Sequence, residues 1–168
     1  MIDLSTIQLY FDYNYWAHRR VWECILTLSD EQFTHNLGYS LGSIHAQVVH
    51  VMSGEWVWLT RLRGYMPTAM LKTEAYPTRE AVRARWDEIE ADVRGYLPTL
   101  TAVQMNETLT YRTMTGGELQ NRYGEILLHV INHGTDHRAQ ILAMLHQLGA
   151  PTVEQDLIFY LREKAKIT

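Results

Sequence analysis

Apolar residues recur every three or four positions along most of the chain, which is the spacing of one face of an α-helix. The pattern predicts five helices, over about residues 5–28, 41–62, 78–97, 122–148 and 152–166. Glycine and proline residues separate or end these segments, as expected for turns and helix ends. Four long helices followed by a short one indicate an all-α protein with a four-helix bundle. In the short last helix, Leu157, Ile158 and Leu161 form the predicted packing side.

One stretch departs from the helical period. Between the third and fourth predicted helices, residues 107–121 contain alternating Thr, Leu and Tyr residues that lead up to Gly116 and Gly117. Alternation followed by a glycine pair is typical of a β-hairpin. We therefore expect a small hairpin or extended crossover here, which would let the chain cross the bundle.

Length and composition narrow the range of functions. The chain has 168 residues and 46% hydrophobic content, which suits a single domain over residues 1–168. The formal net charge is -4, and the absence of a Lys or Arg run argues against nucleic acid as a partner. There is no signal-like N-terminus and no apolar run of membrane-spanning length, so we expect no membrane association and a cytoplasmic location. The single cysteine, Cys24, excludes an intrachain disulfide.

Three polar residues lie on otherwise apolar helix faces and need partners there. Asn14 and His18 share the apolar face of the first predicted helix. They either form hydrogen bonds with other core groups or line a polar pocket, and the pattern does not separate these alternatives. Glu55 lies within the apolar second helix, about 140° around the helix from His50. It would either orient a ligand imidazole or act as a capping or ion-pairing carboxylate, and the angle favours the latter.

The fourth predicted helix carries histidines at steps of four residues: His129, His133 and His137. Residues four apart lie on one face of a helix, with Cβ atoms about 5–6 Å apart. Neutral imidazoles packed on an inward face would each need a hydrogen-bond partner. Coordination of a metal ion would explain such a row of histidines, and imidazole is a suitable ligand for Zn, Ni, Cu and Fe.

One ion cannot bind all three histidines of the row, because the first and last are about 12 Å apart along the helix axis. Two consecutive members must be used, and spacing alone leaves both pairs open. Another helix must then supply the third ligand. His50 is the best candidate because it lies in an apolar helix, and His18 is the second. The remaining histidines have more polar surroundings and are expected at the surface: His35, His45 and His146.

Residues 43–59 and 129–140 resemble the second-helix and fourth-helix signatures of the DinB-like family of metal-binding proteins. Residues 13–17 and 151–161 also resemble the family, so the likeness extends over nearly the whole chain in order. The fourth-helix motif is the specific part of this likeness. Two positions differ from the common family pattern, since the family often has Asn near His18 and His or Tyr at Asp136.

The resemblance implies an up-down-down-up bundle with a left-handed twist and one divalent metal ion, Zn or Ni. It places the metal ligands at His50, His133 and His137, with His129 as a neighbour rather than a ligand. Many family members form homodimers, so the resemblance also implies a homodimer here.

Three histidines leave open coordination positions on an ion, as in catalytic rather than structural sites. Relatives of the family include S-transferases that use a low-molecular-weight thiol, so we expect a metal-dependent enzyme that joins such a thiol to an electrophile held in an aromatic pocket. His129, Asn14 and His18 are the candidates to position substrate or move a proton. A metal-dependent hydrolase is a second enzyme hypothesis. A non-catalytic, stress-related dimeric protein that stores or senses metal is the alternative.

Overall fold

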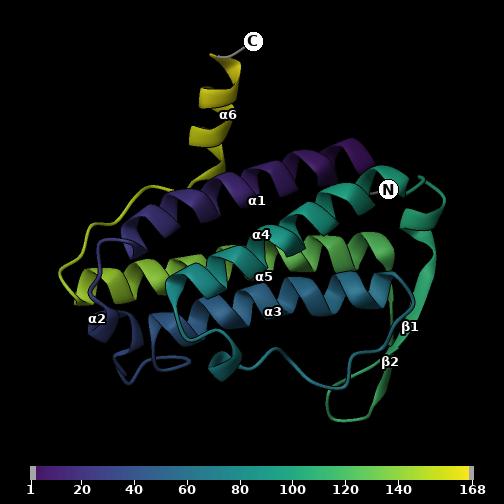
Figure 1. Cartoon of the computed structure of the whole chain (residues 1–168). Helices are drawn as coiled ribbons and strands as arrows, with labels where there is room; N and C mark the ends of the chain where they lie inside the picture. The colour runs from purple at the N-terminus through teal and green to yellow at the C-terminus, as the bar shows by residue number, and fades with distance from the viewer. Residues whose placement is uncertain (1–2, 167–168) are drawn as a thin grey trace.

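The computed structural model describes residues 3–166 and is mostly helical, with one small sheet (Figure 1). Its α-helices are α1 (Leu4–Ile25), α2 (Asp30–Thr34), α3 (Ile44–Leu62), α4 (Arg79–Tyr96), α5 (Tyr123–Gln147) and α6 (Leu157–Ala165). Its strands are β1 (Thr108–Arg112) and β2 (Glu118–Arg122). The all-α class with a hairpin in the connection before α5 is therefore confirmed.

Short polar side chains determine where three of the long helices begin. Asp3, Ser43 and Thr78 each accept a hydrogen bond from the backbone N–H three residues later, at the starts of α1, α3 and α4. Such a cap satisfies a backbone donor that has no partner inside the helix. Because Ser43 is the cap, α3 begins at Ile44, three residues later than the apolar pattern predicted.

Hydrogen bonds between the long helices show their relative directions. Gln47 and His50 of α3 contact Gln140 and His133 of α5, so the two helices are antiparallel. In the same way, Arg94 contacts Asp12, and Arg79 contacts the chain just after α1, so α4 is antiparallel to α1. Contacts of Glu55 with Trp86 and of Leu62 with Tyr96 make α3 parallel to α4. Thus α1 and α5 run one way and α3 and α4 the other (Figure 1).

The hairpin covers one end of the bundle. Its two strands are antiparallel, with Thr108 opposite Arg122 and Arg112 opposite Glu118. Gly116 has a φ of 92°, a conformation that glycine adopts easily in a tight turn. Tyr111 is the buried residue of β1, and its ring meets Trp58 of α3 edge-on at 5.0 Å. The strands thus bring an aromatic side chain to the α3–α5 side of the bundle.

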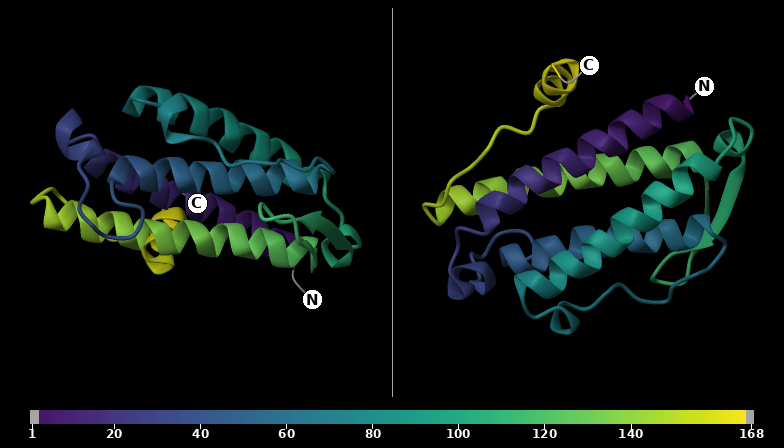
Figure 2. Two further views of the ribbon diagram at one scale, coloured as in Figure 1. Left: turned by 90° about the horizontal axis from the view of Figure 1, so that it is seen from below. Right: turned by 45° about the horizontal axis from the view of Figure 1, so that its top comes forward.

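Helix α6 differs from the prediction in both length and packing. It begins at Leu157 instead of about residue 152, and none of its residues is buried. Ile158, predicted to pack, is 47% exposed. Figure 1 and the right-hand view of Figure 2 show α6 standing away from the bundle, and Leu157 and Leu161 are only half-buried. Its contact with α1 uses Tyr160 instead, whose ring packs against Tyr13 and Trp16.

The hydrophobic core lies between the four long helices. Fully buried side chains come from each of them, among them Phe11, Met52, Ile89 and Ile141. Within residues 3–166, no helix combines the length and apolar character needed to span a membrane.

Candidate metal centre

Three histidines from two helices meet at the α3–α5 interface. The ligand nitrogens of His50, His133 and His137 all lie within 4.8 Å of one another. His50 Nε2 is 3.1 Å from His133 Nε2, and the ring centroid of His137 lies 4.6 Å from that of His50 and 4.4 Å from that of His133. We call these residues the three-histidine cluster. The structure therefore brings together the same three histidines that the family resemblance names.

The positions of the cluster residues follow from the helices that carry them. His133 and His137 lie one turn apart on α5, and the antiparallel α3 places His50 opposite them. Gly54, one turn after His50, leaves room for the His133 ring. A Cβ atom at Gly54 would lie 2.9 Å from His133 Cε1, which is too close for an ordinary contact.

The cluster residues are held in their uncharged form. Partial burial and the proximity of the other histidines lower the pKa of His133 to about 3. The pKa of His50 is also lowered by burial and by nearby His137, and burial lowers the pKa of His137. Neutral imidazoles keep a nitrogen lone pair free, which is the form that binds metal ions. At neutral pH the cluster thus offers lone pairs rather than positive charge.

The cluster fits a divalent cation. Two imidazole nitrogens on one tetrahedral zinc ion are about 3.3 Å apart, given Zn–N bonds of about 2.0–2.1 Å. The separation of 3.1 Å between His50 Nε2 and His133 Nε2 is close to this value. Among the described residues, this is the group of His, Cys, Asp or Glu side chains that could hold a metal ion, and it contains no acidic member.

Gln47 is a site residue that the sequence pattern did not single out. Its side chain is fully buried, and its Oε1 lies 2.7 Å from His137 Nδ1. A signal for it exists in the sequence, because Gln47 is a polar residue on an apolar helix, one turn before His50. A residue three positions from a ligand lies on the same helix face and points toward the same partner helix.

His129 lies beside the cluster and outside it. Its ring centroid is 5.7 Å from that of His133, and it meets the Trp58 ring edge-on at 5.4 Å. The pKa of His129 is lowered by partial burial. His129 borders a cavity of about 240 Å³, whose lining residues are Trp58, Tyr111, Asn121, Glu125, Ile126 and His129. We call this the His129 cavity.

A second hollow adjoins the cluster on the side of His50. It has a volume of about 210 Å³, and its lining includes His50, Val49, Ser53, Met70 and Leu71. His50 of the cluster thus lines this second hollow, whose walls are both polar and apolar, whereas His129, the neighbour of the cluster, lines the first.

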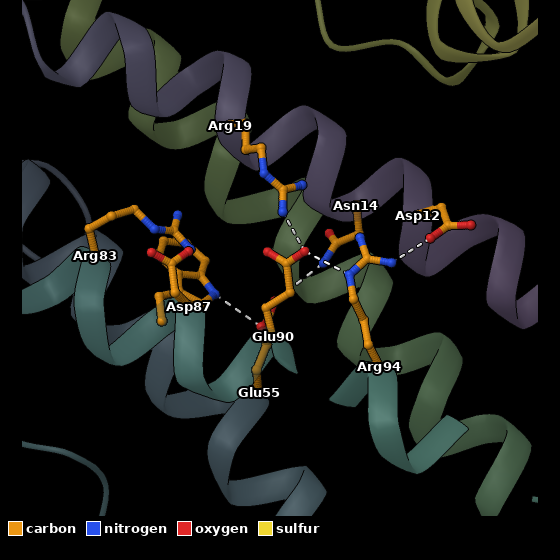
Figure 3. A network of polar contacts seen from close by, with 9 residues as sticks. Asp12, Asn14, Arg19, Glu55, Arg83, Asp87, Glu90 and Arg94 are labelled. Carbon is orange, nitrogen blue, oxygen red and sulfur yellow. Dashed lines mark hydrogen bonds and ion pairs between the residues drawn. The ribbon is translucent and has the colours of Figure 1, made fainter. Parts of the chain in front are cut away.

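Asn14, His18 and Glu55 belong to a separate buried group. Asn14 Nδ2 donates to Glu55 Oε1 at 3.2 Å (Figure 3). Trp86 Nε1 donates to Glu55 Oε2 at 3.0 Å. Arg138, which is fully buried, donates to Asn14 Oδ1 and lies 3.3 Å from His18 Nε2. We call these five residues the Glu55 network. Asn14 and His18 thus form hydrogen bonds with other core groups, the first of the two alternatives left open by the sequence.

Burial dominates the electrostatics of the Glu55 network. Burial raises the pKa of Glu55 to about 7, against the effect of hydrogen bonds from Trp86 and Asn14. Burial, reinforced by nearby Arg138, lowers the pKa of His18 well below its usual range. A neutral His18 cannot form an ion pair with Glu55, although the two side chains are 3.5 Å apart. Glu55 contacts no histidine of the cluster in these hydrogen bonds, so it does not orient a ligand imidazole.

One of the three histidines expected at the surface is buried. His45 is 8% exposed, and its Nε2 lies 2.7 Å from the backbone oxygen of Tyr76. The ring also packs against Phe33 of α2 at 5.0 Å. The prediction was wrong because α2 and the segment before α4 cover the first turn of α3. His35 and His146 are exposed, as expected.

Comparison with known proteins places the chain in a family. The model of the DinB family matches residues 1–166. The chain belongs to the DinB family. Protein DinB of Bacillus subtilis (strain 168) is 27% identical over 157 residues, which cover 90% of this chain and 91% of that protein. The crystal structure of a DinB-like protein from Bacillus cereus ATCC 10987 has a similar fold, with a TM-score of 0.56. The likeness covers 86% of this chain and 95% of the other, at 16% identity.

Proposed function

We propose that this DinB-family protein is a metal-dependent enzyme in which His50, His133 and His137 hold one divalent ion, zinc or nickel. The observation that carries the proposal is the convergence of three uncharged imidazoles without an acidic residue among them. Imidazole is a preferred ligand of both metals. Because all three ligands are neutral, the double positive charge of an ion would remain uncompensated. A site of this kind attracts an anionic fourth ligand.

We further propose that the reaction is the transfer of a low-molecular-weight thiol to an electrophile. When bound, a divalent ion supplies Lewis acidity, which lowers the pKa of a coordinated thiol or water. The protein side chains supply the binding surface next to it. Trp58 and Tyr111 offer aromatic walls for the apolar part of an electrophile in the His129 cavity.

His129 is the side chain best placed to move a proton in this reaction. Its lowered pKa keeps the ring neutral at pH 7, so it can accept a proton there. It borders the His129 cavity and lies next to His133. Asn14 and His18 are enclosed in the Glu55 network instead, so the proposal gives them a structural role.

A conjugation assay tests this function. The tag-free protein, reconstituted with zinc or with nickel, is mixed with monochlorobimane and one of several thiols, such as cysteine or glutathione. We expect a conjugation rate above that of the thiol alone, which is lost after chelation and in His133→Ala. A protein that binds metal but shows no added rate with any tested thiol would contradict the transferase proposal.

The same experiment series separates the alternatives. A metal-dependent hydrolase would use the same site on ester or amide substrates, so hydrolysis of such substrates without thiol turnover would favour it. A non-catalytic metal-binding role predicts a large fall in melting temperature on chelation and no turnover of any substrate class.

Homodimer formation stays a prediction from the family resemblance. Sedimentation equilibrium would test it, with a mass of twice 19.6 kDa as the expected result.

A further inference from the structure

A chain of hydrogen bonds leads from the three-histidine cluster to the protein surface. His137 Nδ1 is 2.7 Å from Gln47 Oε1. Gln47 Nε2 donates to Gln140 Oε1 at 3.0 Å, and Gln140 Nε2 donates to Asp136 Oδ2 at 3.1 Å. His137 and Gln47 are buried, whereas the Asp136 side chain is exposed. We call this the Gln47 relay.

The exposed end of the relay determines its direction. A carboxylate oxygen can only accept hydrogen bonds, so Gln140 must present its NH₂ group to Asp136. The Gln140 oxygen then faces Gln47 and requires a donor there. Gln47 therefore turns its own NH₂ group toward Gln140, which leaves its oxygen to face His137. Reversal of either amide would bring two oxygens or two NH₂ groups together.

The direction of the relay fixes the tautomer of His137. Because Gln47 presents an oxygen, His137 must carry its proton on Nδ1 and donate it. The lone pair of the neutral ring then lies on Nε2, the nitrogen that remains to contribute to the cluster.

We propose that Gln47 and Gln140, anchored by Asp136, are positioning residues that preset His137 as an Nε2 metal ligand. This inference rests on the proposed metal site. Partners that fix the tautomer and ring orientation of a ligand histidine typically contribute about 10–100-fold to metal affinity. In this protein two neutral amides lie between the ligand and the carboxylate, so the relay orients His137 without placing a negative charge against it.

The arrangement of the helices supports this role. Gln47 lies one turn before His50 on α3, so the same helix face supplies one ligand and the orienting group for another. Asp136 and Gln140 are four residues apart on α5 and bracket His137. Ser40, in the loop before α3, also donates its hydroxyl to Gln140 Oε1. This second donor reinforces the orientation of the Gln140 amide.

The test uses variants of Gln47 in the full-length protein. Gln47→Met keeps the side-chain length but removes both hydrogen-bonding groups. Isothermal titration with zinc should show an affinity about 10–100-fold below that of the unchanged protein. Gln147→Met, at the exposed end of α5, is the matched control and should bind zinc normally. Circular dichroism and thermal melting confirm that each variant is folded.

A double variant that reverses the hydrogen-bond direction of the Gln47 relay should restore tight zinc binding. In Gln47→Glu combined with Asp136→Asn, the new amide at position 136 can donate to Gln140, and Gln140 can donate to the new carboxylate at position 47. The relay then runs in the opposite direction and still ends on an acceptor for the Nδ1–H group of His137. We expect this double variant to bind zinc at least as tightly as the unchanged protein. Gln47→Glu alone should bind less well than the double variant, because Gln140 then cannot satisfy both carboxylates.

Nitrogen-15 NMR of the metal-free protein at pH 7.5 reads the tautomer directly. We expect His137 to be protonated on Nδ1, and to become a mixture of tautomers in Gln47→Met. Unchanged zinc affinity and an unchanged tautomer in that variant would overturn the relay while leaving the metal site intact. If the unchanged protein bound no zinc, the proposed function would fail, and the NMR result would still test the relay.

Discussion

The three-histidine cluster and the Glu55 network both use residues of α3 and α5, yet their chemistry is opposite. Helix α5 contributes His133 and His137 to the first and Arg138 to the second. In the Glu55 network, Asn14 and Trp86 donate to a carboxylate, and the side chains are buried. In the cluster, three imidazoles face one another, and two of them remain partly exposed.

This difference separates a structural polar group from a binding site. Buried polar groups are stable when donors meet acceptors, as Asn14 and Trp86 do at Glu55. The cluster has no acidic side chain among its three neutral imidazoles, and a group of this kind could hold a metal ion. A glycine supports each group, since a Cβ at Gly134 would lie 2.5 Å from Asn14 Oδ1 and one at Gly54 would crowd His133.

The largest expected effect comes from breaking the Glu55 network. Arg138→Met removes a fully buried cation and leaves Asn14 Oδ1 without this donor. We expect the free energy of unfolding to fall by about 3–5 kcal/mol, as measured by urea denaturation. Arg162→Met, on the exposed surface of α6, should change it by less than about 0.5 kcal/mol. Equal effects of the two substitutions would show that the network is not structurally important.

The next effect concerns the pH dependence of stability. The pKa of Glu55 is about 7 in the folded protein and near 4.5 in the unfolded chain. Between these two pH values the folded protein therefore keeps a proton on Glu55 that the unfolded chain has released. The stability contribution of this group is present below pH 4.5 and is lost as the pH rises to about 7.

Glu55→Gln isolates this contribution from the histidines, whose lowered pKa values act in the opposite direction. The difference in unfolding free energy between the unchanged protein and Glu55→Gln should decrease by about 3 kcal/mol between about pH 4 and pH 8. The exposed Glu154→Gln serves as the control. A difference that stays constant with pH would mean that the pKa of Glu55 is the same in the folded and unfolded states.

A smaller expected effect concerns the packing of the His133 ring in the cluster. Gly54→Ala would push the His133 ring out of place, so we expect zinc affinity to fall about 10–100-fold. Gly95→Ala is the matched control, because a Cβ there meets nothing within 4 Å. It should leave zinc binding unchanged and add up to about 1 kcal/mol of helix stability. Comparable zinc affinity in both variants would contradict the role given to Gly54.

The smallest expected effect on metal binding separates His129 from the cluster. His129→Ala should change zinc affinity by less than about threefold, because His129 contacts His133 by ring packing and, unlike Gln47, has no hydrogen bond to a ligand in the described structure. The thiol-transfer rate of His129→Ala should fall if His129 moves the proton, since general acid–base catalysis raises a reaction rate about 100-fold or more. A loss of zinc binding comparable to that of His133→Ala would make His129 a ligand.

Much of the fold follows from local sequence signals. The apolar period predicted the long helices to within about three residues, and alternation before Gly116 predicted the hairpin. Helix α6 was harder, because the periodicity that makes Leu157 and Ile158 a stripe does not say whether another helix lies opposite. His45 was misplaced for the same reason, since its burial depends on α2 and on the segment before α4.

The site was predictable only in part from spacing. Steps of four residues identified the histidine row, but the pairing of His50 with His133 depends on the antiparallel approach of α3 and α5. The choice of ligands came from the family resemblance. Gln47 stands out locally as a polar residue in an apolar helix, but its contact with His137 and the direction of its relay depend on the approach of α3 to α5.

Zinc titration of the chelator-treated protein by calorimetry tests the central claim most directly. We predict one zinc ion per chain for the unchanged protein. His50→Ala should bind more than about 100-fold more weakly while keeping its helical circular dichroism spectrum. An unchanged protein that takes up no zinc or nickel, or a folded His50→Ala that binds as tightly as before, would contradict the three-histidine metal site.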